Sequence, residues 1–187
     1  MRPLLLLLLL LLAMPALAQP IPRAPTPAQL ELDRAFEALR TAPDEPSAHI
    51  VEQRIRQLIA ARATPAIALL LSRGQRNLAS DLAEEALEDF DAAITLAPEA
   101  TEPWFGRALA HHATGDATAA GRDLQQVLRL EPRHWQALQQ LAQWQEEAGD
   151  DAGALRSIEA ALAIHPRLRG GEARLRDLRR KALGDDA

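Results

Sequence analysis

A repeat of 34 residues constrains the fold of this chain more than any other feature of its sequence. Three consecutive segments, 67–100, 101–134 and 135–168, align without a gap, and each ends in an apolar-x-apolar-x-Pro phrase. The recurring positions are the small residues Ala86, Ala120 and Ala154, the large apolar residues Phe90, Leu124 and Ile158, and then Ala93, Val127 and Ala161. A small residue lets two helices approach closely while the large one fills the groove between them, so we predict stacked helix pairs.

The turns and the first helices of the repeats resemble those of the tetratricopeptide repeat family. Trp104 stands where the family favours Trp, and Gly115-Asp116 and Gly149-Asp150 supply the turn between two helices. The first repeat has Asp81 in place of Gly, and we expect Asp81 and Glu84 to form a capping box there. The residues that replace the family's usual Tyr are Asn77, His111 and Gln145. The resemblance implies an all-α fold, a tetratricopeptide-type α-solenoid of antiparallel helix pairs in a right-handed superhelix.

Weaker helical patterns precede the repeats. Thr26-Pro27 predicts the start of a first helix, and Ser47 is expected to cap a second helix that ends before Thr64-Pro65. The apolar residues at helical spacing in the first of these helices are Leu32, Ala35, Phe36 and Leu39. We interpret 28–66 as a divergent amino-terminal helix pair that covers the amino end of the stack.

One more helix is expected after the repeats. Gly170-Gly171 precedes it, and Leu175, Leu178 and Ala182 form a single apolar stripe along it. Its other face is charged, as the exposed side of a terminal element must be. We therefore expect 169–187 to be a carboxyl-terminal capping helix and tail.

Residues 1–18 have the organisation of a secretory signal peptide. Arg2 precedes a leucine run over 4–12, and Ala16-Leu17-Ala18 matches a cleavage site. We expect cleavage after Ala18, an exposed linker over 19–27 and a periplasmic bacterial protein, with secretion beyond the periplasm as the alternative. The leucine run is shorter than the ~20 residues of a membrane span, so no membrane insertion of the mature chain is expected. An uncleaved anchor is the rival interpretation.

Charge and cysteine content exclude several classes of partner and site. The net charge of −5 gives no basic field for nucleic acid, and the absence of Cys excludes disulfides and thiolate metal sites. Basic residues nevertheless crowd the carboxyl end: Arg167, Arg169, Arg174, Arg176, Arg179, Arg180 and Lys181. Such a cluster is either a solvated helix face or a docking patch for an acidic partner.

The five histidines are the only evident candidates for catalysis or metal binding. His111 and His112 are adjacent, so on a helix their side chains diverge by about 100° and cannot chelate one ion together. The chain has no Gly-rich phosphate loop, no G-x-S-x-G elbow and no H-E-x-x-H motif. We therefore expect no enzyme activity, no cofactor and no metal.

The expected binding surface is the concave groove that the first helices of the pairs line in the family. Its predicted residues are Leu71, Gln75, Leu78, Phe105, Leu109, His112, Gln139, Gln143 and Glu146. For Phe105 and Leu109, packing against a neighbouring repeat is the alternative. Some family members clamp a terminal carboxylate with Lys, Asn and Arg in this groove. The corresponding residues here are Leu71, Gln75, Gly106, Gln136 and Gln140, so the resemblance implies that this clamp is absent.

The sequence thus predicts a protein-binding adaptor or scaffold that holds a peptide or partner protein, as a monomer or weak homo-oligomer. A self-associating structural spacer of the cell envelope is the second hypothesis. A hydrolase or metal-binding protein that uses His111 and His112 is the third.

Overall fold

The computed structural model describes residues 24–183, and within them it contains nine helices and no strand. The helices are α1 (Pro27–Arg40), α2 (Glu45–Ala60), α3 (Pro65–Ala79), α4 (Ala83–Leu96), α5 (Thr101–Ala113), α6 (Ala117–Leu130), α7 (Trp135–Glu147), α8 (Asp151–Ile164) and α9 (Gly171–Leu183). The all-α fold class is confirmed. The expected signal peptide, its cleavage site after Ala18 and the linker up to residue 23 lie outside the described residues. No helix between residues 24 and 183 has both the length and the apolar character needed to cross a membrane.

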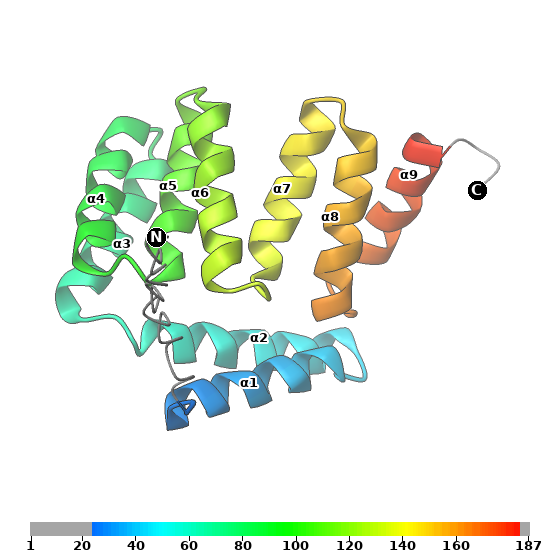
Figure 1. Ribbon diagram of the computed structural model, residues 1–187, viewed down its shortest axis with the longest axis horizontal. Coiled ribbons are helices and arrows are strands. Elements are labelled where there is room, and N and C mark those ends of the chain that lie inside the picture. The colour runs from blue at the N-terminus through cyan, green and yellow to red at the C-terminus, as the bar shows by residue number, and fades with distance from the viewer. Residues whose placement is uncertain (1–23, 184–187) are drawn as a thin grey trace, which may run out of the picture.

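Helices α3 to α8 form three antiparallel pairs that stack side by side, and α9 continues the stack after α8 (Figure 1). The repeat positions identified in the sequence all lie at helix contacts. Ala86, Ala120 and Ala154 are completely buried, and so are the large residues Phe90 and Leu124 beside them. The packing between α6 and α7 is sparser than that between α4 and α5. The 34-residue pattern therefore describes the helix contacts within each pair better than the contacts between pairs.

The turns inside the pairs use one left-handed residue each. Gly115 and Gly149 have φ angles of +85° and +77°, and Asp81 takes the same place in the first repeat with a φ of +59°. The capping box expected for Asp81 and Glu84 is wrong. The backbone position that caps α4 belongs to Leu82, which has no side-chain oxygen to accept a hydrogen bond.

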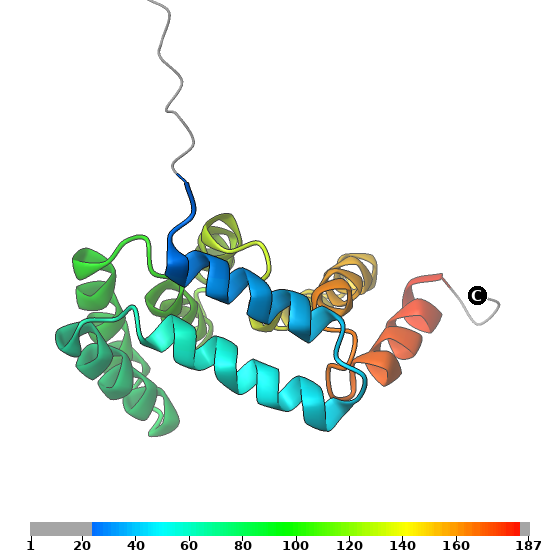
Figure 2. The ribbon, with the colours of Figure 1, turned by 90° about the horizontal axis from the view of Figure 1, so that it is seen from below.

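Helices α1 and α2 do not cover the amino end of the stack, contrary to the expectation for 28–66. They form a hairpin, called the strap below, that lies across the ends of the stacked helices (Figures 1 and 2). The apolar face of the strap packs in one cluster with α7, α8 and α9. The rings of Phe36 and Trp135 meet edge to face with their centroids 6.0 Å apart. The strap therefore joins the start of the chain to the third repeat.

Polar contacts between residues far apart in the chain hold the strap in this place. The ring of His165, completely buried at the end of α8, shares a 2.6 Å hydrogen bond with a Glu52 carboxylate oxygen on α2. Arg133 donates to Asp33 on α1 at 2.7 Å and lies over the Phe36 ring. Since helix propensity says nothing about which distant surface a hairpin covers, these partners could not be inferred from local patterns.

The strap and the first repeat begin at capped helix ends. Thr26 forms a capping box with Gln29, and the Thr64 hydroxyl accepts from the backbone of Ile67, as Thr-Pro pairs at both positions predict. The cap of α2 is Asp44, whose carboxylate accepts from the backbone N–H of Ser47 at 2.8 Å. Ser47 itself lies inside the helix, so the expected Ser47 cap is wrong.

Helix α9 closes the carboxyl end with Leu175 and Leu178 buried against α8. Arg174 and Lys181 both donate to Glu146 on α7, and Arg179 donates to Glu159 on α8. These hydrogen bonds use three of the seven residues of the basic cluster to fix the terminal helix on the stack. They favour a structural role for those residues over a docking patch.

Candidate functional site

A pocket of about 310 Å³ lies between the strap and the first helices of the three pairs. Its apolar walls come from Ile55 and Ile59 on α2, Leu71 on α3, Phe105 on α5 and Trp135 on α7. Helix α2 thus forms one wall and the concave side of the stack the other. A short, mostly apolar recess bounded by several rigid helices is the usual form of a ligand or peptide site.

A second pocket, of about 270 Å³, adjoins the first. It is lined by Ile59 and Leu71, which also line the first pocket, and by residues between α4 and α5. Leu32 of α1 closes it from the strap. The two pockets share the lining residues Ile59, Leu71, Glu102 and Glu131, so they are adjoining halves of one region under the strap. We call it the strap pocket.

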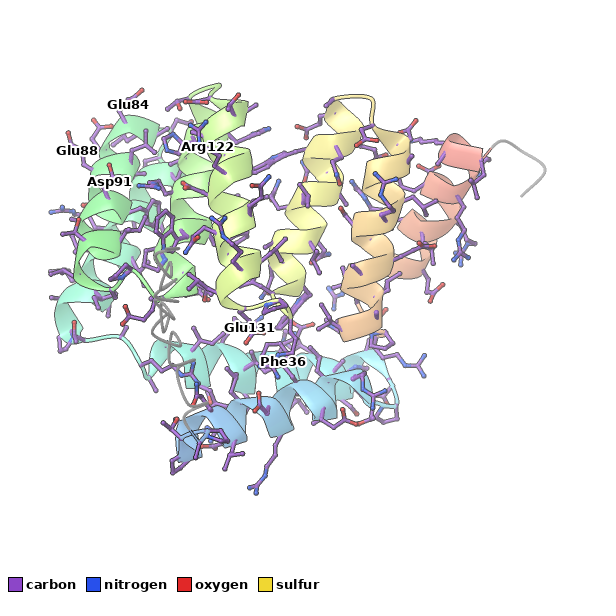
Figure 3. The ribbon with its side chains drawn as sticks, in the orientation of Figure 1. Phe36, Glu84, Glu88, Asp91, Arg122 and Glu131 are labelled. Carbon is purple, nitrogen blue, oxygen red and sulfur yellow. The ribbon has the colours of Figure 1, made fainter. Side chains whose placement is uncertain are left out.

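Polar side chains also line the strap pocket, and they come from the strap as well as from the stack. Glu102 in the first turn of α5 and Glu131 before α7 line both halves. His134 is buried, accepts from the backbone of Ala137 at 3.1 Å and lies 3.8 Å from the Glu102 carboxylate. Figure 3 shows Glu131 beside Phe36, where the strap meets the stack. The Arg133 guanidinium donates hydrogen bonds to the carboxylates of Glu131 and Asp33, and these bonds, the one to Glu131 most of all, raise the pKa of Arg133 above its ordinary value.

The structure places three of the predicted groove residues in the strap pocket: Leu71, Gln75 and Phe105. Phe105 also packs beside Ala108 and Leu124 in the core between the second and third repeats, and its ring lies 5.0 Å from that of His134. The sequence analysis assigned Phe105 to the groove, with packing against a neighbouring repeat as the alternative. The structure gives it both positions, one edge in the core and one in the pocket.

The other predicted groove residues lie elsewhere. Leu78 packs against the core of the first repeat. The His112 ring stacks on Trp144 at a centroid distance of 4.4 Å and lies 3.2 Å from Glu147. Gln143 and Glu146 line a shallow hollow beside α9. Leu109 and Gln139 are half-buried and line none of these pockets. The nine residues therefore do not form one surface.

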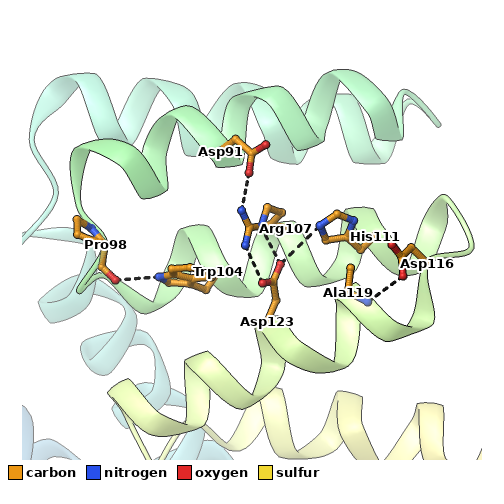
Figure 4. Close-up of polar contacts among 8 residues, drawn as sticks. All are labelled: Asp91, Pro98, Trp104, Arg107, His111, Asp116, Ala119 and Asp123. Carbon is orange, nitrogen blue, oxygen red and sulfur yellow. Dashed lines mark hydrogen bonds and ion pairs between the residues drawn. The ribbon is translucent and has the colours of Figure 1, made fainter.

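A repeated ion pair inside the helix pairs was missed at the sequence level, although its spacing is visible there. Arg107 donates two hydrogen bonds of 2.8 Å to the buried carboxylate of Asp123 and a third, of 2.6 Å, to Asp91 of the preceding repeat (Figure 4). Arg73 and Asp89 form the same pair 34 residues earlier. Two of the residues at the family's Tyr position also reach the Asp of their own repeat. Asn77 donates to Asp89 at 3.0 Å, and His111 lies 3.9 Å from Asp123.

The third repeat replaces this charged set with an uncharged one. Leu141 stands in place of the Arg, and Ser157 in place of the Asp shares a 2.6 Å hydrogen bond with the side-chain amide of Gln145. Searching for polar residues at the repeat period would have found all three sets. Their role is to hold the two helices of each pair together, not to form a site.

The histidines do not gather at one place. Between residues 24 and 183 no group of three or more His, Cys, Asp and Glu side chains is arranged to hold a metal ion. His111 faces Asp123, His112 stacks on Trp144, and His165 contacts Glu52. Each of these rings thus has a packing partner of its own.

Comparison with known proteins agrees with this architecture. The chain is 29% identical over 154 residues to a TPR repeat-containing protein of Rhizobium etli, covering 82% of this chain and 76% of that one. The crystal structure of the Sgt2 TPR domain from Aspergillus fumigatus superimposes with a TM-score of 0.58 and 22% identity, over 64% of this chain and 80% of that one. The crystal structure of MamA protein gives 0.58 and 18%, over 85% and 84%. No protein-family model matches the chain.

Proposed function

We propose that this chain, which resembles tetratricopeptide repeat proteins in sequence and in fold, is a non-catalytic adaptor that binds a segment of a partner protein in the strap pocket. The observation that carries the proposal is the pocket itself. Its apolar walls come from the strap and from all three pairs, so a bound segment would contact every repeat. Tetratricopeptide-type stacks present such extended surfaces for protein binding.

The strap distinguishes this pocket from an open concave groove. Ile55 and Ile59 cover part of the surface that the stack would otherwise present to solvent. A partner segment would therefore enter a recess that the strap bounds on one side, and not lie along an open trough. Burying apolar side chains there would supply ~25 cal/mol per Å², before the ordering costs of binding are subtracted.

Capture of partners from cells tests the proposal. Leu71→Ser removes an apolar wall shared by both halves of the pocket, whereas Leu69→Ser changes a leucine that is 64% exposed on the same helix. We expect the first change to abolish capture of the partners that the unaltered protein retains, and the second to preserve it. Melting temperatures of both variants show that the stack is intact. Equal capture by both folded variants would contradict the proposal.

The proposed location is the bacterial periplasm, and it rests on the amino-terminal pattern over residues 1–18 alone. Amino-terminal sequencing of the protein from fractionated cells tests it. A mature chain that begins at Gln19 in the periplasmic fraction supports the location. Full-length protein that begins at Met1 in the membrane or cytoplasmic fraction contradicts it.

A further inference from the structure

The charges around the strap pocket are unequal, and this inequality indicates what kind of segment fits it. Three carboxylates line the pocket, on Glu99, Glu102 and Glu131, against two guanidinium groups, on Arg56 and Arg62. The two arginines are directed to other partners. Arg56 donates to Glu52 at 3.4 Å, and Arg62 donates to the carbonyl of Ala28 at 3.3 Å. Neither guanidinium pairs with a carboxylate of the pocket.

The three carboxylates differ in how far they are compensated. Glu131 accepts two hydrogen bonds from the Arg133 guanidinium, at 2.8 and 2.9 Å, so its charge already has a partner. Glu102 and Glu99 form no ion pair with Lys or Arg in the part of the chain that the structure describes. The side chain of Glu102 is 34% exposed, and its carboxylate lies 3.8 Å from the ring of His134. Glu99 is exposed to solvent, so Glu102 is the partly buried acid of the pocket that lacks a Lys or Arg partner.

The position of Glu102 makes this charge relevant to a ligand. It lines both halves of the pocket, as do the apolar residues Ile59 and Leu71. An apolar side chain placed between Ile59 and Leu71 would thus bring its sequence neighbours close to the Glu102 carboxylate. A cation there would gain an ion pair in a partly desolvated setting, whereas an acidic neighbour would be repelled.

We propose that the strap pocket selects a basic amphipathic segment of the partner protein, with an apolar side chain between Ile59 and Leu71 and a Lys or Arg on Glu102. The inference rests on the proposed function and adds the chemistry of the partner to it. It is opposite in charge to the recognition of a terminal carboxylate. The competing explanation is that Glu102 serves only the amino-terminal end of α5, where acidic residues are favourable in any helix.

Fluorescence anisotropy with three labelled synthetic peptides tests this inference. The peptides share one leucine spacing and differ only in the flanking residues, which are all lysine, all glutamine or all glutamate. We expect the lysine peptide to bind the full mature protein at least about tenfold more tightly than the glutamate peptide. Glu102→Gln should weaken the lysine peptide by roughly threefold to fivefold, the range for one partly exposed ion pair. Glu84→Gln, an exposed change in the first turn of α4 far from the pocket (Figure 3), should leave it unchanged.

The possible results separate this inference from the proposed function. If all three peptides bind equally and Leu71→Ser abolishes their binding, the pocket is a binding site but has no charge preference. That result would overturn the inference. No binding of the lysine peptide would also overturn the inference, while the capture experiment with Leu71→Ser still decides whether the pocket binds partners. If the lysine peptide binds Glu102→Gln as tightly as the unaltered protein, Glu102 serves only the amino-terminal end of α5. That result would also overturn the inference.

Discussion

The ring of Phe90 on α4 packs directly over the backbone of Gly74 on α3. A Cβ atom added at Gly74 would lie 2.8 Å from the ring, closer than real side chains approach. Gly106 on α5 lies against the same ring, so the ring cannot move away from one glycine without meeting the other. One aromatic side chain thus sets the spacing of three helices in two repeats.

Gly74→Ala should therefore destabilise the protein by about 1–3 kcal/mol, the range for overpacked cores. At an exposed position inside a helix the same change would stabilise the protein by about 0.5–1 kcal/mol. The sign of the change in the free energy of unfolding therefore shows whether Gly74 is closely packed. The second repeat has Ala108 and Leu124 at the equivalent positions, and adding Phe90→Leu should recover part of the loss. Urea unfolding of the single and double variants measures both effects.

Gly121→Ala is the matched control for this prediction. Gly121 lies inside α6, and a Cβ added there would have no neighbour within 4 Å. We expect a neutral or stabilising effect of up to ~1 kcal/mol. If Gly74→Ala were as well tolerated as Gly121→Ala, the close packing of α3, α4 and α5 on Phe90 would be wrong.

Leu82→Asp should stabilise the protein by about 1 kcal/mol, because it supplies a missing helix cap. Asp116 and Asp150 occupy the equivalent positions in the next two repeats, and each accepts a backbone hydrogen bond of 2.8 Å. The backbone angles at Leu82 are close to those at both aspartates. Leu82→Ala, which cannot cap, should give no gain. A thermal melt in which the two variants coincide would show that the cap does not form.

The helix pairs, the cap of α4 and the strap differ in how far the sequence could predict them. Ala120 and Leu124 recur at the repeat period, and the helix pairs follow from them because each contact is made by residues close in the chain. Leu82 breaks the pattern, so the cap was assigned to the wrong residue. The strap could not be placed, because its partners Trp135 and His165 lie about a hundred residues away from it. The wall of the strap pocket that α2 forms could not be predicted either, because it depends on where the strap lies.

Asp123→Ser should cost about 2–4 kcal/mol, since it leaves the Arg107 guanidinium half-buried without its main partner. Replacing Arg107, His111 and Asp123 together should reduce the free energy of unfolding by less than the single change does. The triple variant Arg107→Leu, His111→Gln, Asp123→Ser reproduces the residues of the third repeat, which needs no buried charge. Guanidinium unfolding of the two variants compares them. If the triple variant is less stable than Asp123→Ser, the attraction between Arg107 and Asp123 itself stabilises the second repeat. The loss in Asp123→Ser would then not come only from leaving Arg107 without its partner.

Glu52→Gln should reveal a pH-dependent attachment of the strap. Burial raises the pKa of Glu52, but the hydrogen bonds and charges of His165 and Arg56 outweigh it and hold the pKa below the ordinary value of 4.5. His49 also faces this carboxylate, at 3.6 Å. A lowered folded-state pKa means that the stabilisation is complete above pH 4.5 and is lost as the pH falls through the folded-state value.

At neutral pH we therefore expect Glu52→Gln to reduce the free energy of unfolding by about 1.5–3 kcal/mol, as for a hydrogen bond to a charged group. The difference between the variant and the unaltered protein should shrink below pH 4.5, where Glu52 becomes protonated and resembles Gln. Glu37→Gln is the control, because Glu37 is an exposed acid on the strap whose pKa is lowered mainly by its hydrogen bond with Arg40. A stability gap that is the same at acid and neutral pH would contradict the assignment of Glu52.

Site-specific photocrosslinking in intact cells tests the central claim, that the strap pocket is the surface that binds a partner protein. A photoreactive residue is placed at Gln75, which lines the pocket, or at exposed Gln125 on α6, which lines none of the pockets described. We predict a defined crosslinked partner from position 75 that is absent from position 125 and disappears when Leu71→Ser is added. The same partner crosslinked equally from both positions, or retained after Leu71→Ser, would contradict the account.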